Sequence, residues 1–213
     1  PWGYHQLVMN WGWVRVNQRV LNMMAPDCPN AAYPWPHGEP ALGEIDSPDE
    51  RFDDYFTFNE GIPWTSAIAT QGYQVMTHYS FTRFMSLYDN GVGFVNFFSK
   101  ADNDLLIAEA LIRSGGSKDE AAVMINNSRV EKGGLEAASA SEADSDLLEK
   151  VYYERFVETM MTYPLTGYFD RRRTDVQDMG LRDGTVRHLP VPYQELSVHE
   201  YPIYTFGGAG NEM

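Results

Sequence analysis

Cysteine is nearly absent from this chain, since Cys28 is the only one among 213 residues. A disulfide framework within the chain and a zinc site built from several thiolates are therefore excluded. Long hydrophobic runs are missing as well. No apolar stretch approaches the roughly 20 residues that cross a bilayer, and no basic-then-apolar signal segment stands at the front. We expect the chain to be soluble as it stands.

Basic residues are scarce. Sixteen lysines and arginines face thirty aspartates and glutamates, which gives a formal net charge of -14. The excess acid spreads over the whole length instead of forming a tail. A field of this sign repels phosphate backbones, so we do not expect nucleic acid as a partner.

The short motifs of catalysis are also missing. The sequence contains no G-x-S-x-G, no P-loop, no G-x-G-x-x-G and no H-E-x-x-H, the patterns that place a nucleophile, a phosphate or a zinc ion. The five histidines show no pair at the helical spacing of metal ligands; they are His5, His37, His78, His188 and His199. We therefore expect no catalytic residue, no metal and no cofactor.

The most regular part of the sequence runs from residue 99 to 161. The pattern predicts a helix capped by Asp102 or Asp104 that continues to about Ser114 and ends at a glycine pair. Ser117, with Glu120 three residues on, starts a second helix to about Glu131, again closed by two glycines. The short loop between them predicts antiparallel packing, and a third helix is expected over 145–161.

Charged residues interrupt these helices. A calcium loop starting at Asp102 would need an oxygen ligand and a glycine where Leu106 and Ile107 stand, so that interpretation fails. Glu109 sits among apolar residues, and a buried carboxylate needs a partner. We expect Arg113, four residues on, or Arg129 in the next helix.

A second group of charges lies in "YYERFVE" and "GYFDRRRTD", with Glu154, Arg155 and Glu158 followed by Asp170 and the arginines at 171–173. Arginine clusters bind phosphate and carboxylate groups, so an anion site is one interpretation. Acids interleave with the bases, however, and this favours a buried structural network in which the charges neutralise one another.

The remaining sequence is less regular. Apolar spacing predicts a helix over 5–24, after which closely spaced prolines predict a loop of about thirty residues. Residues 72–87 fit neither the helical nor the strand period. "VGFVNFF" at 92–98, after the turn "DNG", is predicted as a short extended segment. From Gly167 onward, prolines and glycines predict turns and short extended pieces such as "RHLPVPY".

Five short motifs occur in a recognisable order over residues 99–206: "ADNDLLIAEALIRSGG", "AAVMINNSRVEKGGL", "YYERFVE", "YFDRRR" and "HLPVPYQEL". This order resembles the C-terminal half of SusD/RagB-like proteins. Two departures are plain. "TMMTYPLTG" after Glu158 replaces a shorter glycine-containing step, and Asn103 and Asp104 stand where an apolar pair is usual.

The resemblance implies a mainly α, SusD-like helical fold with tetratricopeptide-like helix pairs, long irregular loops and a few short strands. It divides the chain into a helix and aromatic, proline-rich loop region at 1–98 and a SusD-like region at 99–213. Such proteins are lipid-anchored at the cell surface of Bacteroidetes-type outer membranes, where they bind a glycan or other nutrient. They deliver it to a SusC-like TonB-dependent transporter and do not catalyse. They are about twice this length, and the opening "PWGYHQ" fits a chain that lacks the lipidated cysteine.

Exposed aromatic rings suit a glycan binder because sugar rings stack on flat apolar surfaces. Tyr33, Trp35 and Trp64 lie in or just beyond the least regular region, and we predict them as ligand-binding residues. Packing onto another part of the protein is the alternative explanation for their size.

Two other functions fit the sequence less well. A helix-repeat scaffold in a surface assembly would bind proteins and no nutrient. A glycoside hydrolase would use two of the many carboxylates as acid and nucleophile, but each candidate carboxylate here has a structural explanation.

Overall fold

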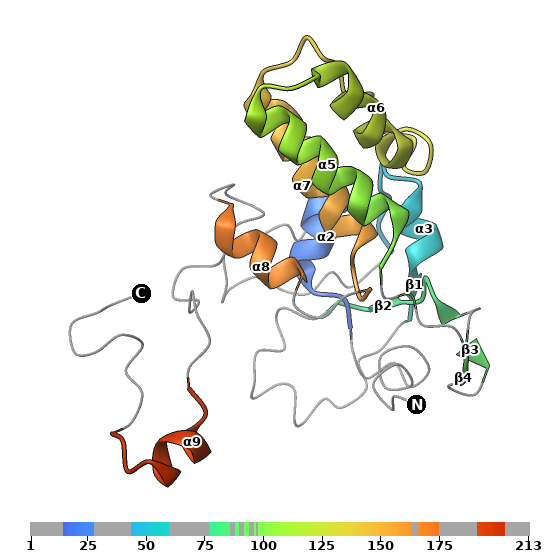
Figure 1. The fold of residues 1–213 in the computed structure, drawn as a ribbon. Coiled ribbons are helices and arrows are strands. Elements are labelled where there is room, and N and C mark those ends of the chain that lie inside the picture. Colours follow the sequence, from blue (N-terminus) through green and yellow to red (C-terminus); the bar gives the residue numbers. More distant parts are fainter. Residues whose placement is uncertain are drawn as a thin grey trace. The chain divides into compact units, whose positions relative to one another are not determined.

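The computed structural model describes residues 15–27, 44–59, 77–85, 88–89, 92–93, 96, 98–162, 166–174 and 191–202. The chain divides into two compact units, Pro1–Gly167 and Tyr168–Met213. The described part is mainly helical (Figure 1). The expected mainly α class is therefore confirmed at this level.

The first unit begins with a short helix and a small sheet. Helix α2 covers Gln18–Met24 and α3 covers Arg51–Tyr55, which leads directly into strand β1, Phe56–Phe58. Strand β1 pairs antiparallel with β2, Tyr79–Phe81, with Thr57 opposite Ser80. Strand β3, Tyr88–Asp89, pairs antiparallel with β4, Val92–Gly93.

Three longer helices follow in this unit, and the second unit holds short ones. Helix α5 covers Lys100–Ser114, α6 covers Lys118–Arg129 and α7 covers Asp144–Glu158. Helix α8, Thr166–Arg173, lies at the boundary between the units, and α9 covers Tyr193–Val198. None of the residues of α9 is buried.

Helix α5 begins earlier than the sequence pattern predicts. Ser99 is its N-cap, and the Ser99 hydroxyl accepts a hydrogen bond from the backbone N–H of Asp102 at 3.1 Å. The prediction that Asp102 or Asp104 caps the helix is therefore wrong. Asp102 instead accepts from Arg155, and Asp104 pairs with Lys100. The predicted glycine end is confirmed, because Gly115 adopts a left-handed φ of 70°.

Helix α6 starts as predicted. The Ser117 hydroxyl accepts from the Glu120 N–H at 3.2 Å, which satisfies a backbone donor that the helix itself leaves free. The α5–α6 pair is antiparallel, as expected (Figure 1). Helix α7 ends at Glu158, three residues before the predicted end, and Met161 beyond it takes a positive φ of 60°.

Other predictions differ from the structure or lie outside the described residues. The predicted 5–24 helix is confirmed over α2, Gln18–Met24, whereas residues 15–17 are not helical and residues 1–14 lie outside the described part. Helix α3 stands in the predicted long loop, and α8 and α9 stand where turns and extended pieces were expected, so those predictions are wrong. The extended segment after "DNG" is confirmed at Val92–Gly93.

Two groups of buried side chains hold the first unit together. An aromatic core joins α2, α3, the β1–β2 sheet and α7, with Leu21, Phe52, Tyr79 and Val157 among its members. Phe52 packs edge-on against Tyr79 with ring centroids 5.1 Å apart. A second group lies where α5, α6 and α7 pack on one another; its most buried members are Leu105, Ala108, Ala121, Ile125, Leu147 and Val151.

Candidate functional site

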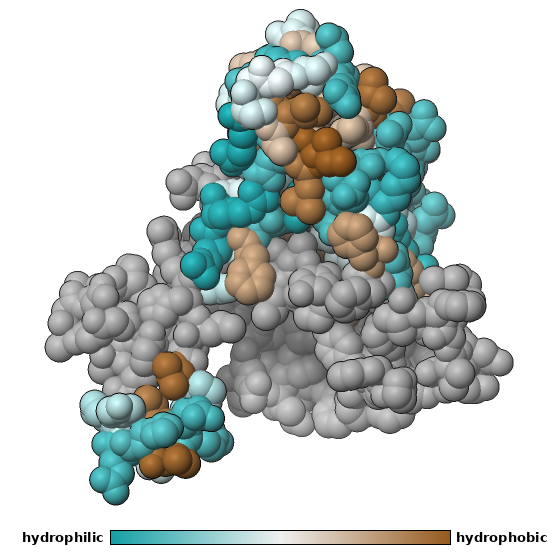
Figure 2. Space-filling model, viewed as in Figure 1, coloured by the Kyte–Doolittle hydropathy of each residue, from teal (hydrophilic) through white to brown (hydrophobic). Residues whose placement is uncertain are grey.

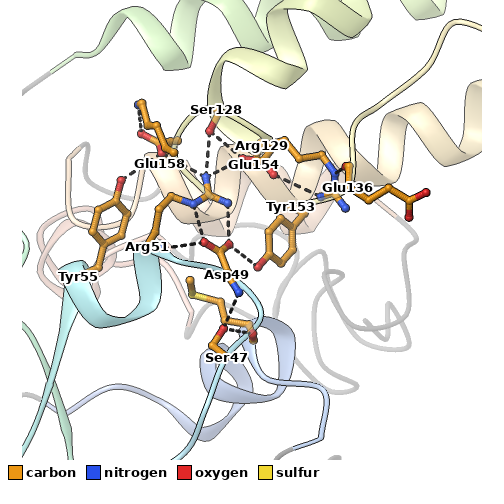
Figure 3. A network of polar contacts seen from close by, with 12 residues as sticks. Ser47, Asp49, Arg51, Tyr55, Ser128, Arg129, Glu136, Tyr153, Glu154 and Glu158 are labelled. Atoms are coloured by element: carbon orange, nitrogen blue, oxygen red, sulfur yellow. Dashed lines mark hydrogen bonds and ion pairs between the residues drawn. The ribbon is translucent and has the colours of Figure 1, made fainter. Parts of the chain in front are cut away.

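The predicted ligand-binding residues Tyr33, Trp35 and Trp64 lie outside the residues that the structure describes. The predicted roles of these three residues therefore stay predictions. What the structure does describe is a buried ionic network centred on Arg51 (Figure 3). The network and the three aromatic residues belong to the same unit, Pro1–Gly167.

Arg51 is 1% exposed, and every nitrogen of its guanidinium group donates a hydrogen bond. Its Nε and Nη2 bind the two carboxylate oxygens of Asp49 at 2.8 and 2.7 Å, a bidentate pair that fixes the plane of the group. Its Nη1 donates to Glu154 at 2.6 Å, to Ser128 at 2.9 Å and to Glu158 at 3.2 Å. Arg51 therefore connects the start of α3 to α6 and α7.

Glu154 and Ser128 form the second layer of the network. The Ser128 hydroxyl accepts from Arg51 and donates to Glu154 Oε2 at 2.7 Å, so a single hydroxyl bridges both charges. Arg129, the next residue on α6, donates to Glu154 Oε1 at 3.4 Å. Glu154 is fully buried on α7 and is paired on both oxygens.

Glu158 collects donors from several segments. Arg83, just after β2, donates to its Oε2 at 2.8 Å and to its backbone carbonyl at 2.9 Å. Lys132, beyond α6, reaches Oε2 at 2.8 Å, and the Tyr55 hydroxyl donates to Oε1 at 3.1 Å. The Arg83 guanidinium also lies over the Tyr55 ring, 4.0 Å from its centroid. One carboxylate on α7 thus ties the sheet, α3 and the end of α6 together.

Local hydrogen bonds fix the positions of Asp49 and Arg51. Ser47 Oγ accepts from the N–H of Asp49 at 3.1 Å, and Asp49 in turn accepts from the N–H of Arg51 at 3.0 Å. This pair of turns replaces a helix cap and aims both charged side chains inward. Glu154 and Glu158 are four residues apart on α7, so they lie on one face of the helix and meet the same arginine.

Two glycines allow the close approach of the loop after α6. A Cβ atom built on Gly133 would lie 2.9 Å from Arg51 Nη2 and 2.9 Å from the carbonyl oxygen of Arg129. Gly134 has a left-handed φ of 61°, and its Cβ would collide with Glu50. The Gly133 carbonyl also accepts from the N–H of Glu50 at 3.0 Å. The glycine pair is therefore part of the network's construction as well as the end of a helix.

The environment sets the ionisation of the network. Burial alone would raise the pKa of Glu158, but Arg83 and Lys132 outweigh it and hold that pKa at about 2. Burial raises the pKa of Glu154 above its ordinary value, against the pull of Arg51. Burial alone would lower the pKa of Arg51, yet Asp49 and Glu154 raise it, so the guanidinium is permanently charged. Burial also raises the pKa of Tyr55 and Tyr153, which remain donors.

The contacts of the network indicate a structural role. None of its buried polar atoms lacks a hydrogen-bond partner, and its carboxylates are 0–1% exposed. A general acid or a nucleophile must reach a substrate, and these groups reach only one another. The predicted buried network is therefore confirmed for Glu154 and Glu158.

Sequence reasoning missed the centre of this network. Asp49 and Arg51 stand in "SPDERF" within the predicted loop, and they meet α7 more than one hundred positions later. A lone arginine among acids in a proline-rich stretch was the available signal. Its partners could not be found from local sequence, because the pairing depends on the tertiary fold.

Of the two partners expected for Glu109, the structure confirms one. Glu109 accepts from Arg113 Nε at 2.8 Å, which confirms the first of the two expected partners. Arg129, the second candidate, pairs with Glu154 instead. Arg155 donates to Asp102 at 2.7 Å and so ties α7 to α5.

In the second unit, Arg173 donates to Asp170 at 2.9 Å on the same helix.

The outward sides of α5 and α6 carry exposed apolar side chains. Leu106 is 43% exposed, Ile107 39% and Val123 62%, and Figure 2 shows apolar side chains gathered over this part of the molecule. Across the part of the chain that the structure covers, no group of metal-ligating side chains could hold an ion. No helix found there combines the length and the apolar character needed to cross a membrane.

Comparison with protein-family models, curated proteins and solved structures finds no match to this chain.

Proposed function

We propose that the chain is a SusD/RagB-like surface protein that binds a nutrient, in particular an oligosaccharide, and delivers it to a TonB-dependent outer-membrane transporter. The observation that carries this proposal is the order of the five motifs over residues 99–206. The proposed location is the outer face of the outer membrane, where a lipid anchor would hold the protein.

The described helices support the proposal in a general way. An antiparallel pair, α5 and α6, is followed by α7, which packs against both. Such a pair is the unit from which tetratricopeptide-like scaffolds are built. The finer, SusD-like arrangement belongs to this proposal.

The structural role of the buried charges also supports a binding function. Glu154 and Glu158 were among the carboxylates that a hydrolase could use, and both are saturated by internal donors. We therefore look for the ligand at Tyr33, Trp35 and Trp64, where flat rings could stack on sugars.

Isothermal titration against a panel of oligosaccharides and peptides tests the proposal. We expect saturable binding of at least one oligosaccharide. Trp35→Ala and Trp64→Ala should each weaken oligosaccharide binding roughly tenfold, since the stacking of a sugar ring on an aromatic side chain contributes about 1–2 kcal/mol. Phe98→Ala is the matched control, because Phe98 is an aromatic residue that is 60% exposed and lies outside the predicted site. Unchanged affinity in both tryptophan variants would remove the site assignment.

A scaffold that binds proteins is the second candidate, and the exposed apolar side chains of α5 and α6 favour it. If no oligosaccharide and no peptide on the panel binds, this second function replaces the first. Leu106→Glu would then weaken association with a protein partner.

A further inference from the structure

The outward side of the α5–α6 pair has the composition of a contact surface. The exposed residues of α5 recur at helical spacing, and Leu106, Ile107 and Ala110 form the middle of this stripe. The exposed stripe of α6 contains Val123 and, directly after the helix, Val130. Figure 2 shows apolar side chains gathered over this helix pair. A single exposed apolar residue is ordinary, whereas a gathered group marks a site of association.

The architecture of helix repeats explains why such a surface needs a cover. Each helix pair buries one side against its neighbour, and α7 packs against both α5 and α6 on their inner side. The outer side of a terminal pair is normally polar, because it faces water. Leu106 is 43% exposed and Val123 62% exposed, so this outer side suits contact with a further helical element.

The exposed charges of the two helices have opposite signs. Those of α5 are the bases Lys100, at the start of the helix, and Arg113, near its end. Those of α6 are the acids Asp119 and Glu120, both near its start, and Glu131 follows just beyond its end. Each helix therefore carries charges of one sign towards both ends of an apolar centre.

The α5 bases stay at the surface although they have partners within their own helix. Lys100 pairs with Asp104 and Arg113 with Glu109, yet 81% and 51% of the two basic side chains are exposed. In the part of the chain that the structure describes, no ion pair joins either base to α6. The complementary charges of the two helices are thus not used up against each other inside one molecule.

From this arrangement we infer that the surface binds a second copy of the same chain, in a two-fold dimer where α5 of each copy packs antiparallel against α6 of the other. Antiparallel packing brings the start of one helix to the end of the next, so Lys100 meets Glu131 of the second copy. At the other end Arg113 meets Asp119 and Glu120. The two-fold axis forms every contact twice and covers both apolar centres at once. This dimer is independent of the proposed nutrient binding.

The size of the surface sets the strength of the dimer. Helix α5 has 15 residues and is about 22 Å long, and two helices side by side are about 20 Å wide. This face lies near the lower limit of specific interfaces, which bury about 800 Å² per partner. We therefore expect a reversible dimer with a dissociation constant on the order of micromolar. Each copy carries a formal charge of -14, so salt should favour the dimer by screening the overall repulsion.

Sedimentation equilibrium of the whole chain tests the inference. At an ionic strength of about 0.15 M, we expect the average mass to rise from one chain towards two chains between roughly 1 and 200 µM. A mass that stays at one chain over this range overturns the inference and leaves the surface to a different protein. Growth beyond two chains overturns the two-fold arrangement, because a closed dimer uses both copies of the surface.

A substitution in the apolar centre locates the interface. Val123→Glu should weaken self-association at least about tenfold, because it would bury a carboxylate between the two copies. Val198→Glu is the matched control, since Val198 is 77% exposed and lies in the second unit. Equal weakening by the two substitutions overturns the assignment to α6. The concentration series on the unaltered protein decides the inference if Val123→Glu fails to fold.

A charge reversal tests the antiparallel pairing. Lys100→Glu should weaken the dimer several-fold, and more than Arg172→Glu, which makes the same change of charge on an exposed arginine of α8. Adding Glu131→Lys to Lys100→Glu should restore the affinity, because the reversed pair meets across the interface. Adding Glu149→Lys, at an exposed position of α7, restores only the total charge. Equal recovery with either lysine would overturn the pairing.

Discussion

At the scale of single residues, Arg51 is the side chain at the centre of the buried ionic network. It bonds to three carboxylates and one hydroxyl and is 1% exposed. Removing a charge from such a group leaves its partners buried and uncompensated, which costs more than the pair itself contributes. Most of the destabilisation expected from removing Arg51 therefore comes from the carboxylates that would remain buried without a partner.

Replacing Arg51 by methionine should lower the free energy of unfolding by roughly 3–5 kcal/mol, because the carboxyl groups of Asp49, Glu154 and Glu158 would stay buried without their guanidinium partner. Urea unfolding followed by circular dichroism measures the change. Lys100→Met is the control, since Lys100 pairs with Asp104 while 81% of its side chain is exposed. Such an exposed pair contributes at most about 1 kcal/mol. Equal effects of the two substitutions would contradict the central role of Arg51.

Glu158 makes the free energy of unfolding depend on pH. Its folded pKa of about 2 lies below the ordinary value of 4.5, so its contribution is complete above about pH 4.5 and is lost as the pH falls towards 2. The difference corresponds to roughly 3 kcal/mol. Unfolding by urea between pH 5 and 2 should show a shallower loss of stability in Glu158→Gln than in the unaltered protein. The exposed Glu149→Gln on the same helix should keep the original pH dependence, and an unchanged slope in Glu158→Gln would contradict the assignment.

At the scale of elements, the loop after α6 is fitted to the network by its glycines. Gly133 has no room for a side chain, whereas Gly115 requires a left-handed backbone but has nothing within 4 Å of a built Cβ. The two positions therefore separate crowding from backbone strain.

Gly133→Ala should cost roughly 1–3 kcal/mol through crowding against Arg51, and Gly115→Ala roughly 1–2 kcal/mol through its positive φ. Measured again in an Arg51→Met background, the cost at Gly133 should shrink because the guanidinium is gone. The cost at Gly115 should stay the same, since distant sites add. A cost at Gly133 that is independent of Arg51 would rule out the proposed contact.

The packing of α5 is tested by two neighbouring leucines. Leu105 is fully buried between helices and Leu106 is 43% exposed. Leu105→Ala should destabilise by roughly 2–5 kcal/mol, and Leu106→Ala by about 0.5 kcal/mol or less. Thermal and urea unfolding of the two variants measure the difference. Similar costs would mean that the helix is rotated from the position described.

The helices from residue 100 to 158 could be predicted from the sequence because their caps, glycine ends and apolar spacing are local signals. Ser117 and Gly115 are examples of signals that act within one turn. Helix α3 could not be predicted, because its five residues are held by Arg51 and the aromatic core and have little helical pattern of their own. The cap of α5 was displaced for a similar reason, since Asp102 binds Arg155 on another helix.

At the scale of the whole molecule, composition and structure give the charges two different roles. Part of the charge is buried in a neutralising network that joins α3, the sheet and the helices. Other charged residues are exposed, among them Asp53, Asp54 and Lys100. The interleaved acids and bases around Glu154 and Glu158 predict a buried network, but they do not predict Asp49 and Arg51, because only the tertiary fold brings those two residues to α7. The predicted ligand residues lie outside the described part, so the site is tested by binding experiments.

The central claim is that this protein binds an oligosaccharide and returns it unchanged. Isothermal titration of the oligosaccharide panel into the protein, followed by chromatography of the recovered sugar, tests it most directly. We predict saturable binding of an oligosaccharide that is recovered intact. Absence of binding by every oligosaccharide, or recovery of shortened products from the purified protein, would contradict the claim.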